Sequence, residues 1–269
     1  MTSFPNLEVA DKKVKGLFYE TSLGSIKVFV KSLPKFAHSD VRLLFDKEIL
    51  LHQSLCHPNI VKLYDASMST SEDPVMIFEF MNQGSLDTHF TNDPLSMSWE
   101  RKLGIACDVA RGIQCIHFNN MTHGNLLPCH VLLDENKPTK LTGLCSNEQA
   151  DSQLEISAVQ LNVTSCLYVA PEVILDDTQY EPPADVFAIG CIMWSLDIMN
   201  DIYSNYSAEK IEFRHIMDWI SSGQFDLITR EFTKDCPQWY VELAKECMRC
   251  DPSERPTIDQ VIDHLENSS

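Results

Sequence analysis

Alternating apolar and polar residues dominate the first part of the chain and predict an antiparallel sheet. Between residues 7 and 33 the apolar positions of this alternation include Phe18, Tyr19, Ile26, Val28 and Val30. A second strand-like run covers residues 74–81, and a Gly-Ser pair follows it soon after. Such a pair is typical of a turn that leads into a helix, so the sheet is predicted to end near residue 81.

A helical spacing of three and four residues begins after Ser39, which we expect to cap a helix. The positions that recur at this spacing are Val41, Leu44, Glu48, Leu51 and Leu55. Glu48 therefore lies within an apolar stripe, where an unpaired carboxylate would be costly. We expect Lys31, in the preceding strand, to be its partner; the alternative is a solvated Glu48 at the edge of the stripe.

Helical periodicity continues in the second half of the chain. A long helix is predicted from Trp99 to His117, and a loop beginning at His123 follows it. An aliphatic, strand-like run ends this loop. Near the end of the chain, Thr257 and Gln260 have the spacing of a capping box that opens a last amphipathic helix.

Composition is that of an ordinary soluble globular protein, with 269 residues, 44% hydrophobic and 22% charged. A net charge of −18 argues against nucleic acid or an anionic membrane surface as a direct partner. The 10 cysteines form no paired framework, which favours reduced thiols and a cytoplasmic location. No apolar run approaches the roughly 20 residues that cross a bilayer, and no signal peptide is predicted.

The run HGNLLPCHVLL at residues 123–133 resembles the protein-kinase catalytic loop, written H-R-D-L-x-x-x-N. Other kinase-like runs follow the family order: VFVK at 28–31, CHPNIV at 56–61, SCLYVAPE at 165–172, DVFAIG at 185–190 and CMRCDPSERPT at 247–257. The chain is thus similar to the protein kinase superfamily from about residue 7 to 265. The resemblance implies an α+β, bilobal fold: an antiparallel small lobe with one helix at residues 1–81, and a mainly α-helical large lobe at residues 82–269.

The positions that carry phosphate transfer in the family are changed here. The proton-accepting aspartate is replaced by Asn125, and the metal-binding asparagine by His130. Gly143 stands where the family has the metal-binding aspartate of D-F-G. A carboxamide is no general base near neutral pH, and imidazole is a poor ligand for Mg²⁺. In the glycine-rich loop only Gly16 remains, with Asp11 and Lys13 at the other glycine positions.

The resemblance also places the nucleotide pocket. Lys31 and Glu48 correspond to the family's ion pair, with a nucleotide contact in doubt, and the adenine-pocket positions are Phe29, Phe78, Met81 and Leu132. Phe29 replaces a small alanine, and overpacking of this kind typically costs about 1–3 kcal/mol. We expect Phe29, together with Phe18, to fill the pocket; the alternative is that Phe29 points elsewhere after a strand shift.

Residues that hold the fold in the family are retained. Asp185 is expected to bind the backbone of the catalytic loop, and Arg255 to pair with Glu172. The acidic residues at 134–135 and 197–209 are expected in solvated loops. His123 is expected to be structural, and Cys145 to be a packed thiol.

This division between fold and chemistry favours a pseudokinase of the tyrosine-kinase-like group, similar to the mixed-lineage-kinase-domain-like, receptor-interacting and integrin-linked pseudokinases. The prediction is no enzyme, no metal, and ATP absent or weakly bound without metal. Its function would be that of a signalling scaffold or allosteric partner that binds a protein, with an active kinase as candidate. Two alternatives stay open: a weak atypical kinase that uses Lys31, and a nucleotide-binding switch without phosphotransfer.

Overall fold

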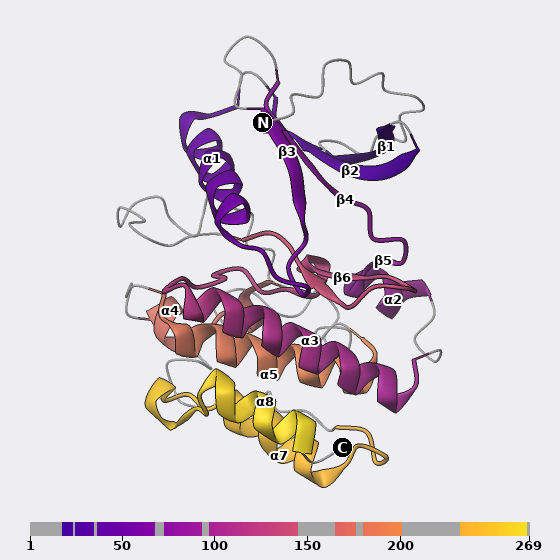
Figure 1. The fold of residues 1–269 in the computed structure, drawn as a ribbon. Coiled ribbons are helices and arrows are strands. Elements are labelled where there is room, and N and C mark those ends of the chain that lie inside the picture. Colours follow the sequence, from indigo (N-terminus) through magenta and orange to yellow (C-terminus); the bar gives the residue numbers. More distant parts are fainter. Residues whose placement is uncertain are drawn as a thin grey trace, which may run out of the picture.

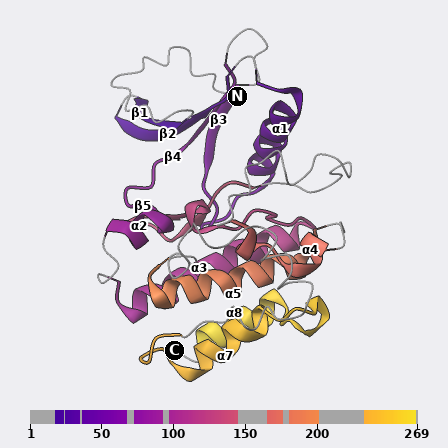
Figure 2. The ribbon, with the colours of Figure 1, turned by 180° about the vertical axis from the view of Figure 1, so that it is seen from behind.

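The computed structural model describes residues 18–23, 25–34, 37–67, 73–92, 97–144, 165–175, 180–200 and 232–267. Its elements form two parts (Figure 1). The upper part contains a sheet and one helix, and the lower part contains a group of helices. The view from behind shows the same division (Figure 2). The predicted α+β bilobal fold is therefore confirmed, whereas the exact boundary between residues 81 and 82 stays a prediction.

The small lobe contains a four-stranded antiparallel sheet in the order β1-β2-β4-β3. Its strands are β1 (Phe18–Leu23), β2 (Ile26–Ser32), β3 (Leu63–Ser67) and β4 (Val75–Glu79). The alternation in β2 follows the prediction, because Val28 and Val30 are fully buried on one face. Helix α1 (Ser39–Ser54) lies beside this sheet (Figure 1).

The buried face of α1 differs from the predicted stripe. Phe45, Glu48, Ile49 and His52 are buried, whereas Val41 is 41% exposed. The spacing of three and four also fits this second set, and packing against the sheet decides between them. The N-cap residue is His38 and not Ser39, which is the first residue of the helix itself.

The large lobe is mainly helical. Its described helices are α2 (Leu86–Asn92), α3 (Trp99–Phe118), α4 (Pro171–Leu175), α5 (Pro182–Ile198), α7 (Gln238–Cys247) and α8 (Ile258–Asn267). A small antiparallel sheet joins β5 (Gly84–Ser85), β6 (Val131–Leu133) and β7 (Lys140–Leu141). Short 3-10 turns lie at Pro128–His130, Ser165–Tyr168 and Pro252–Glu254.

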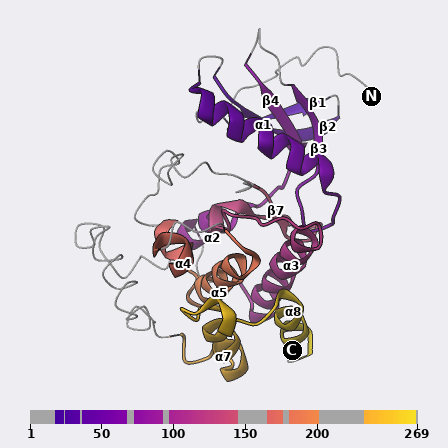
Figure 3. The same ribbon diagram turned by 90° about the vertical axis from the view of Figure 1, so that its left-hand side faces the viewer.

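Helix α5 is the centre of the large lobe, with α3, α7 and α8 around it (Figure 3). Its side chains are buried all round from Ala184 to Asp197, which fits a helix that is apolar on every face. Gly190 allows α7 to approach closely, since a Cβ there would lie 2.8 Å from the Ala244 carbonyl oxygen. This rigid helix supplies Asp185, the residue that positions the loop described below.

The start of α8 confirms one local prediction. Thr257 N–H donates to Gln260 Oε1 at 2.8 Å, and Gln260 N–H donates to Thr257 Oγ1 at 3.3 Å, so the capping box is formed.

The segment after α1 pairs with the large lobe through Val61 N–H and the Leu141 carbonyl, 2.9 Å apart. Among the described helices, none has the length and apolar character required to cross a membrane.

Candidate functional site

Asp185, on α5, holds the start of the loop at residues 123–133. This fully buried carboxylate accepts hydrogen bonds from His123 N–H at 2.8 Å and from Gly124 N–H at 3.1 Å. His117 Nε2, on α3, lies 2.9 Å from the same carboxylate and donates to it. Asp185 therefore fixes the start of the loop between α3 and α5, in the role that was predicted for it.

The three changed positions, Asn125, His130 and Gly143, lie together in the structure. His130 Nδ1 is 2.8 Å from the Asn125 carbonyl oxygen, and the ring of His130 lies directly over Gly143. Because a carbonyl can only accept, the neutral His130 ring carries its proton on Nδ1. Burial lowers the pKa of His130, so the ring is neutral at physiological pH.

His123 packs next to this group, in the structural role expected for it. It is fully buried, its Nδ1 accepts from Asn125 N–H at 3.3 Å, and its ring stacks on His130 with centroids 6.5 Å apart. Burial lowers the pKa of His123 to about 4. Asn125 thus has its main chain fixed from both sides by two neutral imidazoles.

The kinase-like fold implies Mg²⁺ with a nucleotide, and the cleft residues do not fit that ion. Mg²⁺ prefers oxygen ligands in octahedral geometry. Gly143 provides no side chain, and His130 offers only a ring nitrogen. Within the part of the chain that the structure describes, no group of three or more His, Cys, Asp or Glu side chains could hold a metal ion.

The predicted ion pair of the small lobe is present. Lys31 Nζ, on β2, contacts Glu48 Oε2, on α1, with side chains 26% and 9% exposed. Burial raises the pKa of the Glu48 carboxyl, and the neighbouring Lys31 opposes part of that shift. The pair joins the sheet to the helix and presents the Lys31 amine near His130, whose pKa it helps to lower.

All four adenine-pocket positions meet in one apolar cluster. Phe78 and Met81 are among its buried members, and Phe29 and Leu132 are half-buried residues packed against it. Phe29 and Phe78 face each other across the β2–β4 pair. That Phe29 fills the space of an adenine ring stays a prediction.

His52 also packs against this cluster, and the sequence analysis did not identify it as a buried residue. It is buried on α1, and its ring meets Phe78 edge-on with centroids 4.9 Å apart. Burial lowers its pKa to about 3, so it is a neutral aromatic residue in the core. Its spacing of four residues from Glu48 was the available signal.

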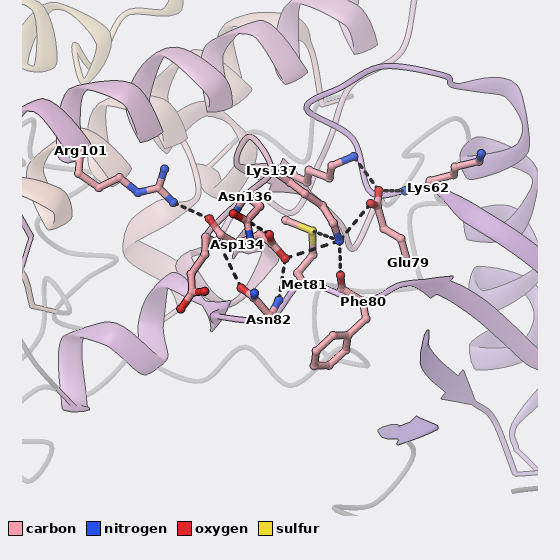
Figure 4. A network of polar contacts seen from close by, with 11 residues as sticks. Lys62, Glu79, Phe80, Met81, Asn82, Arg101, Asp134, Asn136 and Lys137 are labelled. Atoms are coloured by element: carbon pink, nitrogen blue, oxygen red, sulfur yellow. Dashed lines mark hydrogen bonds and ion pairs between the residues drawn. The ribbon is translucent and has the colours of Figure 1, made fainter. Parts of the chain in front are cut away.

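A polar network fixes the segment that joins the lobes, as Figure 4 shows. Glu79 accepts from Lys140 Nζ at 2.7 Å and from Lys62 N–H at 2.8 Å. Lys137 Nζ donates to the Phe80 carbonyl and lies 3.7 Å from Glu79. Lys137 lies between β6 and β7, and Lys140 is the first residue of β7. The large lobe therefore binds the segment that joins the lobes through these two lysines.

Asp134 completes this network from the end of β6. Its Oδ2 accepts from Asn82 N–H at 2.9 Å, and Lys137 Nζ lies 3.5 Å from it (Figure 4). The expectation of a solvated loop was wrong for Asp134, which is 3% exposed. It was also wrong for Asp197, which is buried and accepts from Thr233 N–H at 2.7 Å. In both cases the carboxylate satisfies backbone N–H groups of a turn, which spacing along the chain does not reveal.

Arg255 and Glu172 form the second predicted ion pair. Two guanidinium nitrogens donate to the two carboxylate oxygens at 2.6 and 2.7 Å. The remaining donors bind the carbonyl oxygens of Arg249, Pro183 and Cys250, so the buried guanidinium is satisfied on all sides. This pair ties α4 to the turn before α8.

Several predicted positions lie outside the described residues. They are Asp11, Lys13 and Gly16 of the glycine-rich loop, Cys145, and residues 201–209 of the acidic stretch that was expected in a solvated loop. For Phe18 the description covers the backbone pairing with Lys31 alone.

Comparison with known proteins finds relatives over most of the chain. "Probable serine/threonine-protein kinase drkB" of Dictyostelium discoideum is 30% identical over 263 residues, which is 94% of this chain and 36% of the relative. "Probable serine/threonine-protein kinase drkA" of the same organism is 27% identical over 263 residues, 94% of this chain and 38% of the relative. "Cyclic GMP-binding protein C", also from this organism, is 27% identical over 228 residues, 82% of this chain and 8% of the relative.

These relatives correct one prediction. The sequence reasoning predicted that the chain is not an enzyme, and that prediction is contradicted by relatives named as serine/threonine-protein kinases. The prediction rested mainly on Asn125, His130 and Gly143, together with the lost glycines of the glycine-rich loop. Three positions describe one route of phosphate transfer, and the loss of one route does not remove the enzyme class. The chain spans less than half the length of these curated relatives.

The family model for the protein kinase domain matches residues 22–265, which is nearly the whole chain. This match includes both lobes, the Lys31–Glu48 pair and the loop held by Asp185. The chain belongs to the protein kinase family.

Proposed function

We propose that this chain is a signalling domain of the protein kinase family that acts through contact with a protein partner, an active kinase being the favoured class. The observation that carries this proposal is the distribution of charged groups. Lys31, Asp185 and Arg255 hold partners and fix the two lobes, whereas Asn125 and His130 stand where proton and metal chemistry would be carried. A fixed bilobal body remains available for recognition by another protein.

Location and nucleotide belong to the same proposal. A cytoplasmic location is supported by the reduced state of the cysteines whose side chains the structure describes. Nucleotide binding is weak or absent, and independent of metal, because Phe29 and Phe78 fill the adenine positions and Gly143 holds no cation. The tyrosine-kinase-like group is the proposed place in the family.

A second candidate function is an atypical serine/threonine kinase. The names of the relatives and the intact Lys31–Glu48 pair favour it. Lys31 would then hold the phosphates, and a proton acceptor other than Asn125 would be required. The third candidate, a nucleotide-dependent switch, shares the Lys31 contact and differs in lacking phosphate transfer.

The decisive experiment combines phosphate transfer with capture of the native complex. Wild type, Lys31→Ala and the control Lys27→Ala, on the exposed part of the same strand, are purified and supplied with radiolabelled ATP and casein. In parallel, each is used to capture its complex from cells. The proposal expects one kinase-containing partner set for all three proteins. Phosphate transfer by wild type and Lys27→Ala that is lost in Lys31→Ala would establish the second candidate.

The role of Phe29 is tested by nucleotide-dependent thermal stability. We expect ATP to leave the melting temperature of wild type unchanged and to raise that of Phe29→Ala, because removal of the ring opens the pocket. Ile26→Ala, at an exposed position of β2, is the control and should behave as wild type. If Phe29→Ala also ignores ATP, filling by Phe29 is not the cause.

A further inference from the structure

Position 143 accepts no side chain while the His130 ring stays in place. A Cβ at Gly143 would lie 2.7 Å from His130 Cδ2, 2.8 Å from Cγ and 2.9 Å from Nε2. All three distances are below the 3.0 Å that real Cβ contacts keep. The three atoms belong to one rigid ring, so they cannot give way separately. The φ of Gly143 is +72°, a left-handed conformation that adds strain for most residues.

The ring cannot easily turn away. Its Nδ1–H donates to the Asn125 carbonyl at 2.8 Å, and His123 stacks on it. The main chain is fixed as well, because Thr142 N–H donates to the His130 carbonyl at 3.0 Å and His130 N–H to the Leu127 carbonyl at 2.9 Å. Moving the imidazole would break a buried hydrogen bond and unpack a second buried ring.

We propose that His130 and Gly143 form a steric lock that determines the metal dependence of this site. The imidazole of His130 keeps position 143 free of any cation ligand, so a nucleoside triphosphate that binds weakly beside Lys31 does so in its metal-free form, with the Lys31 amine as its counter-charge. This inference rests on the proposed function, which allows weak, metal-independent binding of a nucleotide. The lock itself rests on the geometry of two side chains alone.

The lock makes the two positions interdependent. A side chain at 143 becomes acceptable only after the ring at 130 is removed, whereas removal of the ring is tolerated with glycine at 143. An aspartate at 143 also suits the backbone, because Asp is among the residues that most readily adopt a left-handed φ. His130 is thus a specificity-determining residue, and the order in which changes are made decides their effect.

A double-mutant cycle of thermal stability tests the lock without nucleotide. The four proteins are wild type, Gly143→Ala, His130→Ala and the double variant. We expect Gly143→Ala to lower the melting temperature by roughly 5 °C or more in wild type, and by less than half as much in the His130→Ala background. The strain of the positive φ is common to both backgrounds and cancels. Equal shifts in the two backgrounds would overturn the lock.

Two controls keep this cycle interpretable. Gly104→Ala, on α3, has nothing within 4 Å of its added Cβ and should show the same small shift in both backgrounds. His130→Ser replaces His130→Ala if the latter does not fold, because it also removes Cδ2 and Nε2, two of the three ring atoms that a Cβ at Gly143 would meet. A coupling seen with Gly104 as strongly as with Gly143 would count against the proposal.

The metal half of the proposal is read with Mn²⁺ and ATP by electron paramagnetic resonance. Wild type and Gly143→Asp should bind no Mn²⁺, whereas His130→Ala/Gly143→Asp should bind about one ion with ATP. Bound Mn²⁺ in Gly143→Asp alone, or none in the double variant, would overturn the link between the lock and metal choice. Neither readout uses a partner or phosphate transfer, so failure of the proposed function is detected separately.

Discussion

The loop at residues 123–133 has two sides that follow different rules. On the side of α5, the fully buried carboxylate of Asp185 accepts from His123 N–H, Gly124 N–H and His117. On the side of the cleft, the neutral ring of His130 rests on Gly143. One side is held by a charge that satisfies several donors, and the other by the shapes of two neighbouring residues.

The difference shows which positions a kinase-like fold can exchange. Buried backbone N–H groups need an acceptor, so the residue that serves them cannot be replaced by itself without cost. His130 and Gly143 meet through the shapes of their atoms, so a change at one can be compensated by a change at its neighbour. The sequence motif around Asp185 therefore keeps its form, while His130 and Gly143 differ from the template together.

Replacing Asp185 by Asn tests the buried side and should have the largest effect. We expect a loss of about 3–5 kcal/mol of unfolding free energy, because the amide has one acceptor oxygen and its NH₂ group faces other donors. Asp259→Asn, at an exposed carboxylate that binds Gln114, should cost less than about 1 kcal/mol. Urea unfolding measures both. A cost below about 1 kcal/mol for Asp185→Asn would remove the distinction between the two sides.

Acid should weaken the core around the cleft. His52 and His123 have pKa values lowered to about 3 and about 4, whereas an unfolded histidine titrates near 6.5. Between these values the unfolded chain binds more protons than the folded one. Stability is therefore complete above about pH 6.5, and each histidine contributes a loss of about 1.4 kcal/mol per pH unit as the pH falls toward 4.

The variant His52→Leu isolates this effect. Leucine keeps an apolar side chain against Phe78 and removes one titrating group, so the unfolding free energy should fall less steeply with acid, by about 1.4 kcal/mol per pH unit. Comparing the two proteins from pH 6.5 to 4.5 cancels the contributions of carboxyl groups, including Glu48. Identical slopes would mean that His52 is already protonated in the folded state.

The polar network around Glu79, in the segment that joins the lobes, offers a smaller test of what it costs to remove the partner of a buried charge. Lys140 lies 2.7 Å from Glu79 with a side chain 11% exposed, and Lys137 lies 3.7 Å from it with 38% exposed. We expect Lys140→Met to cost about 2–3 kcal/mol and Lys137→Met about 1 kcal/mol, because the first leaves a buried carboxylate with less compensation. Denaturant titration of both variants measures the difference. The reverse order would show that the Lys137 contact with the Phe80 carbonyl dominates.

Local pattern predicted those features in which the partners lie close in sequence or belong to a complete motif. Alternation located β2, and the capping box of Thr257 and Gln260 was read from a spacing of three. Glu48 was identified as a charged residue within an apolar stripe. The stripe was right in part, because Glu48 and Leu55 are buried, whereas Val41 is exposed and the sheet also buries Phe45 and Ile49.

Contacts between distant residues were beyond this reasoning. Asp134 was taken for a loop residue, yet it organises the segment near Asn82, some fifty positions away in the chain. His52 was overlooked because its burial depends on Phe78. The prediction about enzymatic activity failed for a related reason, since single positions were interpreted without the relatives that carry the same fold.

The amino-acid sequence by itself determined the kinase-like order of elements, the Lys31–Glu48 and Glu172–Arg255 pairs, and the three altered cleft positions. Only the tertiary structure decided that His130 and Gly143 touch and that the adenine positions share one cluster. It also decided that Lys137 and Lys140 bind the segment that joins the lobes. The physical reason is that hydrophobic period and capping act within a few residues, whereas burial and steric exclusion depend on which distant segments come into contact.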